Sequence, residues 1–270
     1  PRFELVERTL SPEIAQEAFS RASVVFHLAG RPGVQDSWGE GFIDSSRRNI
    51  ELTQRVYEAS VDCQVERVVY ASSSSIYGSG ATSLDVSPEP RPISPYGVSK
   101  LVGEQLAHVY RAQGLHITNL RYFTVYGPRQ RPDMAMHRMF EATTSDGPTF
   151  VRRGDGQQRR EFTYVNDVVT ATVAAGFITE AANATFDVGG GSSVSLQEVM
   201  TLVETLADAP MRIETVVAPA GDPAITVART DVAAEILGWS PKIDLVEGLT
   251  RQCEWHRQRA ASEESVLVAD

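Results

Sequence analysis

Tyr96 and Lys100 form a Tyr-x-x-x-Lys pattern within Pro95–Gly114, a segment that predicts a long helix ending at a glycine. Side chains four residues apart lie on the same face of a helix, so the phenol and the ammonium share one surface. A nearby cation lowers the pKa of a tyrosine and makes it a usable base near neutral pH. The alternative is a chance pair on a solvated helix face. The chain has only one other lysine, Lys242, so the choice of lysine over arginine favours a function.

Two further patterns stand at the ends of predicted strands. The run Ser72–Gly78 (SSSSIYG) follows a buried-type strand at Arg67–Ala71, and His27–Gly30 (HLAG) ends a strand at Val24–Leu28. In open α/β sheets the carboxyl ends of the strands face the ligand crevice, so hydroxyls are well placed there. Small residues let a ligand approach the backbone closely. The alternatives are serines that bond their own backbone and a core histidine followed by a turn glycine.

The elements that must position these residues alternate between strands and helices. One helix is predicted to open at Ser11-Pro12-Glu13, a capping serine followed by a first-turn proline, and another covers Ser46–Ala59. Strands of apolar and β-branched residues are predicted at Arg2–Val6, Val24–Leu28, Arg67–Ala71 and His116–Arg121. This alternation predicts an α/β fold with a doubly wound parallel sheet covered on both faces.

After Gly127 the predicted helices and strands become shorter. Shorter helices and strands are separated by turn-rich stretches at Pro128–Pro132, Gly154–Gln158, Gly189–Ser193 and Pro219–Pro223. We therefore predict one domain at residues 1–127. Residues 128–270 are predicted to form mainly a smaller, mixed α/β substrate-binding lobe, interleaved with the last strands of the sheet.

Composition narrows the class of protein. The 270 residues are 42% hydrophobic and 22% charged, which is typical of a soluble folded chain and not of a disordered one. No apolar run reaches the ~18–20 residues of a membrane helix. The net charge of −10 argues against nucleic acid or an anionic membrane as partner. Cys63 and Cys253 have no metal-type spacing and fit a reducing cytoplasm. The five histidines form no cluster, so no protein-held metal is expected.

These motifs resemble the extended short-chain dehydrogenase/reductase family, in its NAD-dependent nucleotide-sugar epimerase/dehydratase branch, and within it the UDP-glucuronate 4-epimerases. The resemblance runs from about Val24 to Trp239. It is carried by HLAG (27–30), Asn49, SSSSIYG (72–78), SPYGVSK (94–100), RYFTVYGPRQRPDMA (121–135), GDGQQRREFTYVND (154–167) and GD (221–222).

The resemblance implies a Rossmann-like fold in which residues 1–127 bind a tightly held NAD and the other lobe binds a UDP-sugar. It also implies a homodimer that pairs the helices Ser46–Ala59 and Pro95–Gly114. The alternative for those helices is that their apolar faces only pack on the sheet, so dimerisation is an analogy.

One part of the family pattern has no counterpart in the sequence. The family's first strand and Gly-rich turn, which hold the pyrophosphate at a helix N-terminus, are missing, as is the acidic residue for the adenosine ribose. The residues present therefore do not distinguish NAD from NADP. Residue 1 is Pro and no targeting segment follows it. Because Arg2–Val6 resembles a later strand of the sheet, we expect the missing module to belong to the protein.

By resemblance, Tyr96 is the acid/base that takes the proton from the sugar hydroxyl at carbon 4. Lys100 lowers its pKa and bonds the nicotinamide ribose, while Ser73 bonds the same sugar hydroxyl. Hydride passes to the nicotinamide, which leaves a transient 4-keto sugar. The residues that the resemblance places at the cofactor are Leu28, Ala29, Gly30, Asn49, Ser72, Tyr96, Lys100, Tyr122 and Phe123.

The next two residues distinguish the reactions of the family. Its dehydratases carry Asp and Glu after the Ser/Thr, and its UDP-glucuronate decarboxylases carry a Glu at the second position. Here Ser74 and Ser75 occupy those positions, and neither has a carboxylate. What remains is return of the hydride to the other face of the keto sugar, which is 4-epimerisation.

The block from residue 121 to 135 favours a UDP-hexuronate as substrate, with Thr124 and Arg131 meeting its carboxylate and Arg138 as a second candidate. Arg131 could alternatively bind a surface carboxylate or form a basic rim for the diphosphate. By resemblance Arg160 binds the diphosphate, and Asp222 lies on the uridine side. The full set of expected substrate contacts is Pro32, Gly33, Ser73, Ser74, Ser75, Thr124, Arg131, Met134, Ala135, Arg138, Gln158, Arg160 and Asp222.

The sequence leaves other functions open. A 4-epimerase of UDP-glucose or of a UDP-N-acetylhexosamine is the nearest alternative. A dehydratase is opposed by Ser74 and Ser75. A catalytically silent cofactor-binding protein is favoured by the missing Gly-rich turn and opposed by the intact Ser73, Tyr96 and Lys100.

Overall fold

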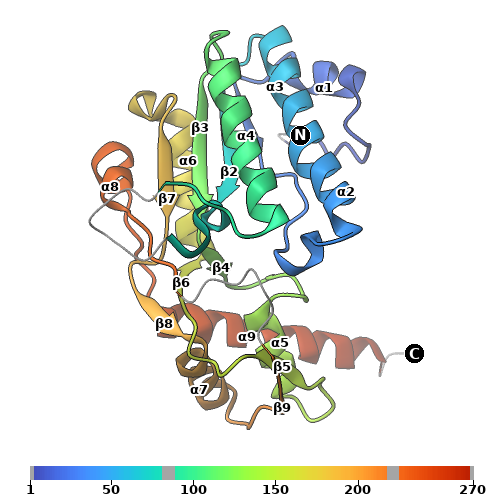
Figure 1. The fold of residues 1–270 in the computed structure, drawn as a ribbon. Helices are drawn as coiled ribbons and strands as arrows, with labels where there is room; N and C mark the ends of the chain where they lie inside the picture. Colours follow the sequence, from blue (N-terminus) through green and yellow to red (C-terminus); the bar gives the residue numbers. More distant parts are fainter. Residues whose placement is uncertain (1–2, 81–88, 218–224, 268–270) are drawn as a thin grey trace. The chain divides into compact units, whose positions relative to one another are not determined.

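The computed structural model describes residues 3–80, 89–217 and 225–267 (Figure 1). The chain divides into two compact units. Unit 1 comprises Pro1–Gly78, Pro90–Arg121 and Thr172–Phe186, and unit 2 comprises Ser79–Glu89, Tyr122–Ala171 and Asp187–Asp270. The assignment of residues 1–127 to the cofactor and of residues 128–270 to the substrate stays a prediction.

The main sheet contains β1 (Val24–His27), β2 (Arg67–Ser73), β3 (Ile117–Tyr122) and β7 (Thr185–Val188), in the order β1-β2-β3-β7. β1 and β2 are parallel. Every residue of β2 is buried, as expected for a strand that is covered on both faces, and its centre is the apolar run from residue 68 to 71. Three of the four predicted strands are therefore confirmed, with ends that differ from the predicted ones by at most two residues.

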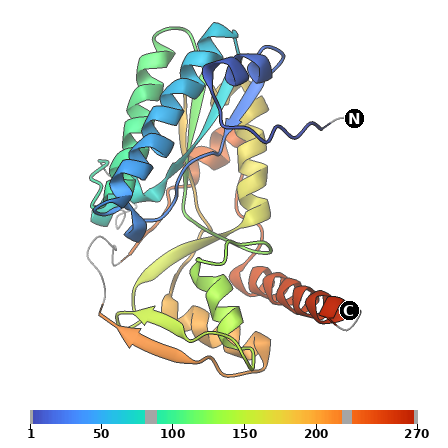
Figure 2. The same ribbon diagram turned by 90° about the vertical axis from the view of Figure 1, so that its right-hand side faces the viewer.

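Helices cover both faces of this sheet (Figures 1 and 2). On one face lie α3 (Leu52–Asp62) and α4 (Pro95–Arg111), whose buried side chains form a core with β2. On the other face α6 (Val165–Phe177) crosses β1 so closely that a Cβ on Gly176 would lie 2.7 Å from the Phe26 ring. The predicted doubly wound α/β architecture is confirmed.

The predicted helix starts are confirmed by their caps. The Ser11 hydroxyl accepts the Ile14 N–H at the start of α1 (Pro12–Phe19), and the Ser94 hydroxyl accepts the Gly97 N–H at the start of α4. Both helices then begin with proline, whose missing N–H has no partner to lose in the first turn.

The helix predicted over Ser46–Ala59 is interrupted. A π-helical turn at Arg47–Glu51 joins α2 (Gly41–Ser46) to α3, and this turn carries Asn49. Such turns inside α-helices are frequently found at functional sites.

The strand predicted at Arg2–Val6 is wrong for its described residues, 3–6, which have no strand structure. Phe3 and Leu5 are 77% and 67% exposed, and the Arg8 N–H turns back to the Val6 carbonyl. A strand requires a neighbouring strand to pair with its backbone groups, and this segment has none among the described residues.

Unit 2 is a mixed α/β structure. Its larger sheet has the order β4-β6-β8, formed by Thr124–Tyr126, Arg159–Tyr164 and Ser193–Ser195, with β4 parallel and β8 antiparallel to β6. A second sheet pairs β5 (Phe150–Arg153) with β9 (Ile213–Val216). The helices are α5 (Ala135–Ala142), α7 (Leu196–Ala207), α8 (Asp231–Leu237) and α9 (Leu245–Leu267).

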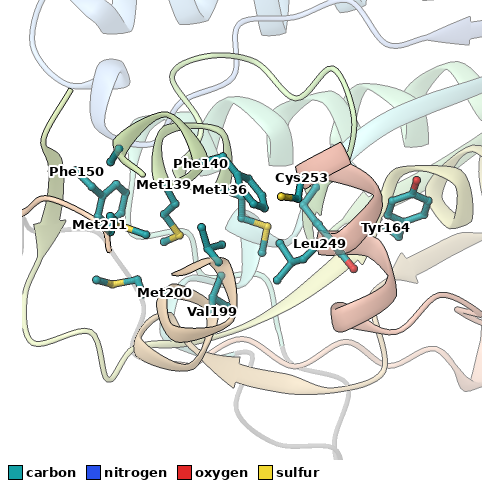
Figure 3. Close-up of a cluster of buried hydrophobic side chains, with 13 residues drawn as sticks. Met136, Met139, Phe140, Phe150, Tyr164, Val199, Met200, Met211, Leu249 and Cys253 are labelled. Carbon is teal, nitrogen blue, oxygen red and sulfur yellow. The ribbon is translucent and has the colours of Figure 1, made fainter. Parts of the chain in front are cut away.

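The core of unit 2 brings α5, α7 and α9 together (Figure 3). Met136 and Met139 of α5 pack with Val199 of α7 and with Leu249 and Cys253 of α9, and all five are buried. This packing holds α5, and with it the turn that precedes α5, close to α9.

Within the described residues, no helix is both long and apolar enough to cross a membrane.

The homodimer stays a prediction. Val98 and Val109 on α4, the helix expected at its interface, are 41% and 53% exposed.

Candidate active site

Lys100 is buried at the carboxyl end of β2. Its Nζ donates to the Ala71 carbonyl at 2.7 Å and lies 5.2 Å from the centre of the Tyr70 ring. Burial lowers the pKa of Lys100 to about 8. The Lys100 ammonium therefore places a positive charge beside the last residues of β2. In mildly alkaline solution a part of the protein molecules carries Lys100 in its neutral form.

Tyr96 is fixed in the first turn of α4 through its backbone. Its N–H donates to the Ser37 hydroxyl at 3.0 Å, and its carbonyl accepts the Ser99 hydroxyl at 2.7 Å. The next residue, Gly97, lies against the serine run, because a Cβ there would be 2.4 Å from the Ser75 carbonyl oxygen. The structure thus brings the Tyr-x-x-x-Lys helix and the serine run together.

Ser73 ends β2 and is 8% exposed. Its oxygen accepts the Ser75 N–H at 3.2 Å, so the local backbone bond that the sequence left as an alternative is present. A hydroxyl has one donor and two acceptor positions, so this bond still leaves its hydrogen to donate. Ser73 therefore keeps the capacity that a contact with a sugar oxygen requires.

Asn49 ties the end of β1 to α4. Its Oδ1 accepts the Arg31 N–H at 2.7 Å, and its Nδ2 donates to the Arg31 carbonyl at 3.0 Å and to the Ser99 hydroxyl at 2.9 Å. A Cβ on Gly30 would lie 2.9 Å from Asn49 Oδ1 and 3.5 Å from Lys100 Nζ, so the position has no room for a side chain. The HLAG segment, Asn49 and the Tyr–Lys helix thus form one connected site.

His27 is a core histidine, as one reading of the HLAG pattern proposed. Burial, with a smaller effect of the Lys100 charge, lowers the pKa of His27 to about 3, so the imidazole is neutral. Its Nε2 lies 2.9 Å from Thr53 Oγ1, and the Thr53 hydroxyl donates to the Asn49 carbonyl at 2.7 Å. Since that hydroxyl gives its hydrogen to Asn49, His27 donates from Nε2.

The cofactor residues expected in unit 1 fit a nicotinamide ribose. Leu28, Ala29 and Gly30 are exposed at the carboxyl end of β1, and the glycine leaves open backbone beside the Lys100 ammonium. Ser72 is buried in β2. Tyr122 and Phe123 belong to unit 2, where the Phe123 N–H donates to the Val188 carbonyl. The roles of these residues stay predictions.

The expected substrate residues divide between the units. Pro32, Gly33 and Ser73–Ser75 lie in unit 1. Thr124, Arg131, Met134, Ala135, Arg138, Gln158 and Arg160 lie in unit 2. Asp222 lies outside the described residues.

Arg131 is engaged by a neighbour. Its Nε and Nη2 donate to the two carboxylate oxygens of Asp133, at 2.9 and 2.7 Å. These hydrogen bonds are the main reason that the pKa of Asp133 is lowered. The geometry shows that this guanidinium can present two parallel donors to a carboxylate.

Among the described residues, no group of three or more His, Cys, Asp or Glu side chains is placed to hold a metal ion.

A family model described as the NAD dependent epimerase/dehydratase family matches residues 5–189. The chain belongs to this family. An uncharacterised UDP-glucose epimerase of Bacillus subtilis (strain 168), YtcB, is 37% identical over 93% of this chain and 79% of its own length.

Solved structures agree with this family. MoeE5 in complex with UDP-glucuronic acid and NAD is 42% identical, with a TM-score of 0.85 over 91% of this chain and 82% of MoeE5. UDP-glucuronic acid 4-epimerase from Bacillus cereus, in complex with UDP-glucuronic acid and NAD, is 37% identical, with a TM-score of 0.84 over 91% and 78%. The Rossmann-like fold is confirmed, and the protein is a nucleotide-sugar epimerase that uses NAD.

The epimerase contains a buried ion pair that sequence reasoning missed. Arg121, at the end of β3, donates from Nε and Nη2 to the two carboxylate oxygens of Glu104, at 3.0 and 2.7 Å. The Ser72 hydroxyl donates to the same carboxylate at 2.5 Å, and Arg121 Nη1 donates to the Tyr77 hydroxyl at 2.6 Å. The pair thus joins β2, β3 and α4 through Ser72, which precedes Ser73, and Glu104, which lies one helical turn after Lys100.

One signal in the sequence pointed to this pair. Glu104 follows Lys100 by four residues and so shares its helix face, and Arg121 opens the RYF block. What the sequence does not give is the pairing, because the two residues come from separate elements.

We expect Glu104→Gln to lower the free energy of unfolding by about 3 kcal/mol, because it leaves the largely buried Arg121 guanidinium without its counter-charge. Urea unfolding measures this change. The matched control is Glu51→Gln, which removes an exposed partner of Arg55 and should change stability by less than about 0.5 kcal/mol. Equal changes in the free energy of unfolding for the two variants would show that the Glu104–Arg121 pair stabilises the protein no more than an exposed pair does.

We expect the wild-type epimerase to gain stability relative to Lys100→Met as pH rises from about 8 to about 10.4. The folded pKa of Lys100 is about 8, below the usual ~10.4 of an unfolded lysine. Within this window the unfolded chain binds the extra proton, so raising the pH favours the folded state. Urea midpoints of both proteins between pH 7 and 10.5 measure the difference, and a difference independent of pH would contradict the burial of a titrating amine.

Proposed function

We propose that the enzyme interconverts UDP-glucuronate and UDP-galacturonate by 4-epimerisation through a transient 4-keto sugar. The observation that carries the proposal is the connected site at the end of β2. There α4, the helix of Tyr96 and Lys100, packs at Gly97 against the serine run, and Lys100 donates to the Ala71 carbonyl just before that run. It is supported by the similarity to MoeE5 and to the Bacillus cereus 4-epimerase, both solved with UDP-glucuronic acid and NAD.

In this proposal the chain's own residues manage the proton at the sugar's 4-hydroxyl. Tyr96 takes that proton, and the Lys100 ammonium favours the phenolate form of the base. Ser73 donates its hydroxyl hydrogen to the sugar oxygen and orients it. NAD, when bound, would supply the acceptor for the hydride of carbon 4 and the donor for its return to the opposite face, so the reaction would have no net oxidation. Lys100 and the side-chain-free backbone at Gly30 would hold the nicotinamide ribose.

Elimination and decarboxylation require acid and base groups that the serine run does not offer. Ser74 and Ser75 are half-buried hydroxyls next to Ser73. A serine hydroxyl without an adjacent base is a poor proton acceptor. The arrangement therefore favours epimerisation over the other reactions of the family.

The hexuronate as substrate rests on Thr124 and Arg131 of unit 2. A planar guanidinium bonds both oxygens of a carboxylate, and the Arg131–Asp133 pair shows Arg131 in this geometry. We infer that the sugar carboxylate takes the place of Asp133 at this guanidinium.

A neutral hexose is the second candidate. MoeE5 has also been solved with UDP-glucose and NAD, and the Bacillus subtilis relative carries the name of a UDP-glucose epimerase.

The first test is proton NMR of the purified protein with UDP-glucuronate and no added cofactor. UDP-galacturonate that approaches a fixed ratio supports the proposal and shows that NAD is retained. Interconversion of UDP-glucose and UDP-galactose instead would keep the mechanism and reject the substrate. No turnover of either pair, even with NAD added, would contradict 4-epimerisation of these sugars.

We expect Tyr96→Phe to fold normally and to reduce turnover by about 10²–10⁴-fold, the usual contribution of general acid–base catalysis. The NMR assay measures the rate. Tyr110→Phe is the matched control, because it removes a phenol from the same helix, where Tyr110 bonds Gln54. Near-normal turnover by Tyr96→Phe would overturn the assignment of the base.

We expect Arg131→Leu to raise the Kd of UDP-glucuronate about 10–100-fold, since a hydrogen bond to a charged group contributes about 1.5–3 kcal/mol. Calorimetry should show little change for UDP-glucose, which lacks the carboxylate. Arg129→Leu tests the alternative of a basic rim. If both variants weakened both sugar nucleotides equally, the arginines would serve the diphosphate and not the hexuronate.

A further inference from the structure

The turn between β4 and α5 separates the two residues proposed to contact the carboxylate. Thr124 begins β4, and Arg131 lies in the turn that leads to α5. The backbone between them is unusual, because Gly127 has φ +136° and Arg129 has φ +64°. A non-glycine residue adopts a left-handed conformation only where its surroundings hold it there.

A buried glutamine of α9 holds this turn. Gln252 is fully buried, and its Oε1 accepts the Gly127 N–H at 3.1 Å while its Nε2 donates to Gln130 Oε1 at 3.1 Å. Gln130 in turn donates from Nε2 to the Val125 carbonyl at 2.9 Å. One amide of α9 therefore fixes both ends of the segment between β4 and Arg131.

His137 of α5 fixes the same turn from the other side. Its backbone N–H donates to Gln130 Oε1 at 3.0 Å, and its Nδ1 lies 2.8 Å from the Gln130 carbonyl oxygen. Gln252 follows Leu249 and precedes Cys253, which pack against α5 in the core of unit 2 (Figure 3). A buried polar network whose members are bonded to one another specifies a single geometry.

We propose that Gln252 is a positioning residue for substrate specificity, acting through Gln130 to hold Arg131 at the distance from Thr124 that suits a carboxylate. The inference rests on the proposed function of Arg131. Two-point recognition of a carboxylate tolerates only about 0.5 Å or 10–20° of misplacement. A neutral hydroxymethyl group makes no such demand, so loosening the turn weakens hexuronate binding selectively.

The experiment compares Gln252→Leu with Gln258→Leu, the same substitution at an exposed position of the same helix. Calorimetry measures the Kd of UDP-glucuronate and of UDP-glucose for each NAD-loaded protein, with thermal unfolding recorded alongside. We expect Gln252→Leu to raise the Kd of UDP-glucuronate about tenfold and that of UDP-glucose less than about twofold. Gln258→Leu should change neither.

Equal weakening of both ligands by Gln252→Leu would show a merely structural role and overturn the inference. If that variant does not fold, Gln252→Glu gives the readout, because it keeps an acceptor for Gly127 and loses the donor to Gln130. It should show the same selective loss, and an unchanged ligand ratio would again overturn the inference.

Arg131→Leu, measured in the same series, separates this inference from the proposed function. If Arg131→Leu leaves the ratio of the two Kd values unchanged, the carboxylate role fails and the inference fails with it. If Arg131→Leu changes the ratio and Gln252→Leu does not, only the positioning role is overturned.

Discussion

The bond from the Lys100 ammonium to the Ala71 carbonyl is the interaction on which the active site depends. It places a cation at the carboxyl end of β2 and sets where α4 meets the sheet, and therefore where Tyr96 lies. Burying the charged ammonium costs free energy, and the lowered pKa of Lys100 reflects this cost. A protein retains a buried cation of this kind where chemistry needs it, because an apolar side chain would fold at least as well.

The surroundings of Lys100 are organised to hold that position. Glu104, one turn further along α4, binds Arg121 and Ser72, so the same helix is fixed to β3 and β2 by charge. Asn49 fixes its first turn to the end of β1 through Ser99. Few of these groups are chemically reactive in the proposed mechanism, yet they determine where the reactive ones lie.

In unit 2 the residues proposed to bind the substrate depend on the conformation of a turn. Two of the proposed substrate residues, Arg131 and Met134, lie on the turn between β4 and α5. In that turn Arg129 has a left-handed backbone, which a non-glycine residue does not favour. This turn is held by a side chain from a helix far away in the sequence, since Gln252 of α9 accepts the Gly127 N–H. In this arrangement specificity can change through residues that never contact the substrate.

The sequence by itself determined the parts of the protein that depend on neighbours in the chain. Ser11 and Ser94 capped their helices, continuous apolar runs gave three strands, and the spacing of Tyr96 and Lys100 put both on one helix face. The sequence also shows Ser74 and Ser75 at the positions where the other reactions of the family require carboxylates.

Tertiary structure decided what depends on distant partners. Residues 3–6 are not a strand, since pairing needs a neighbour. The pKa of Lys100 follows from burial, and the pairs Glu104–Arg121 and Gln252–Gly127 join elements far apart in the chain. Burial and long-range pairing are properties of the packed chain, so no local pattern of residues encodes them.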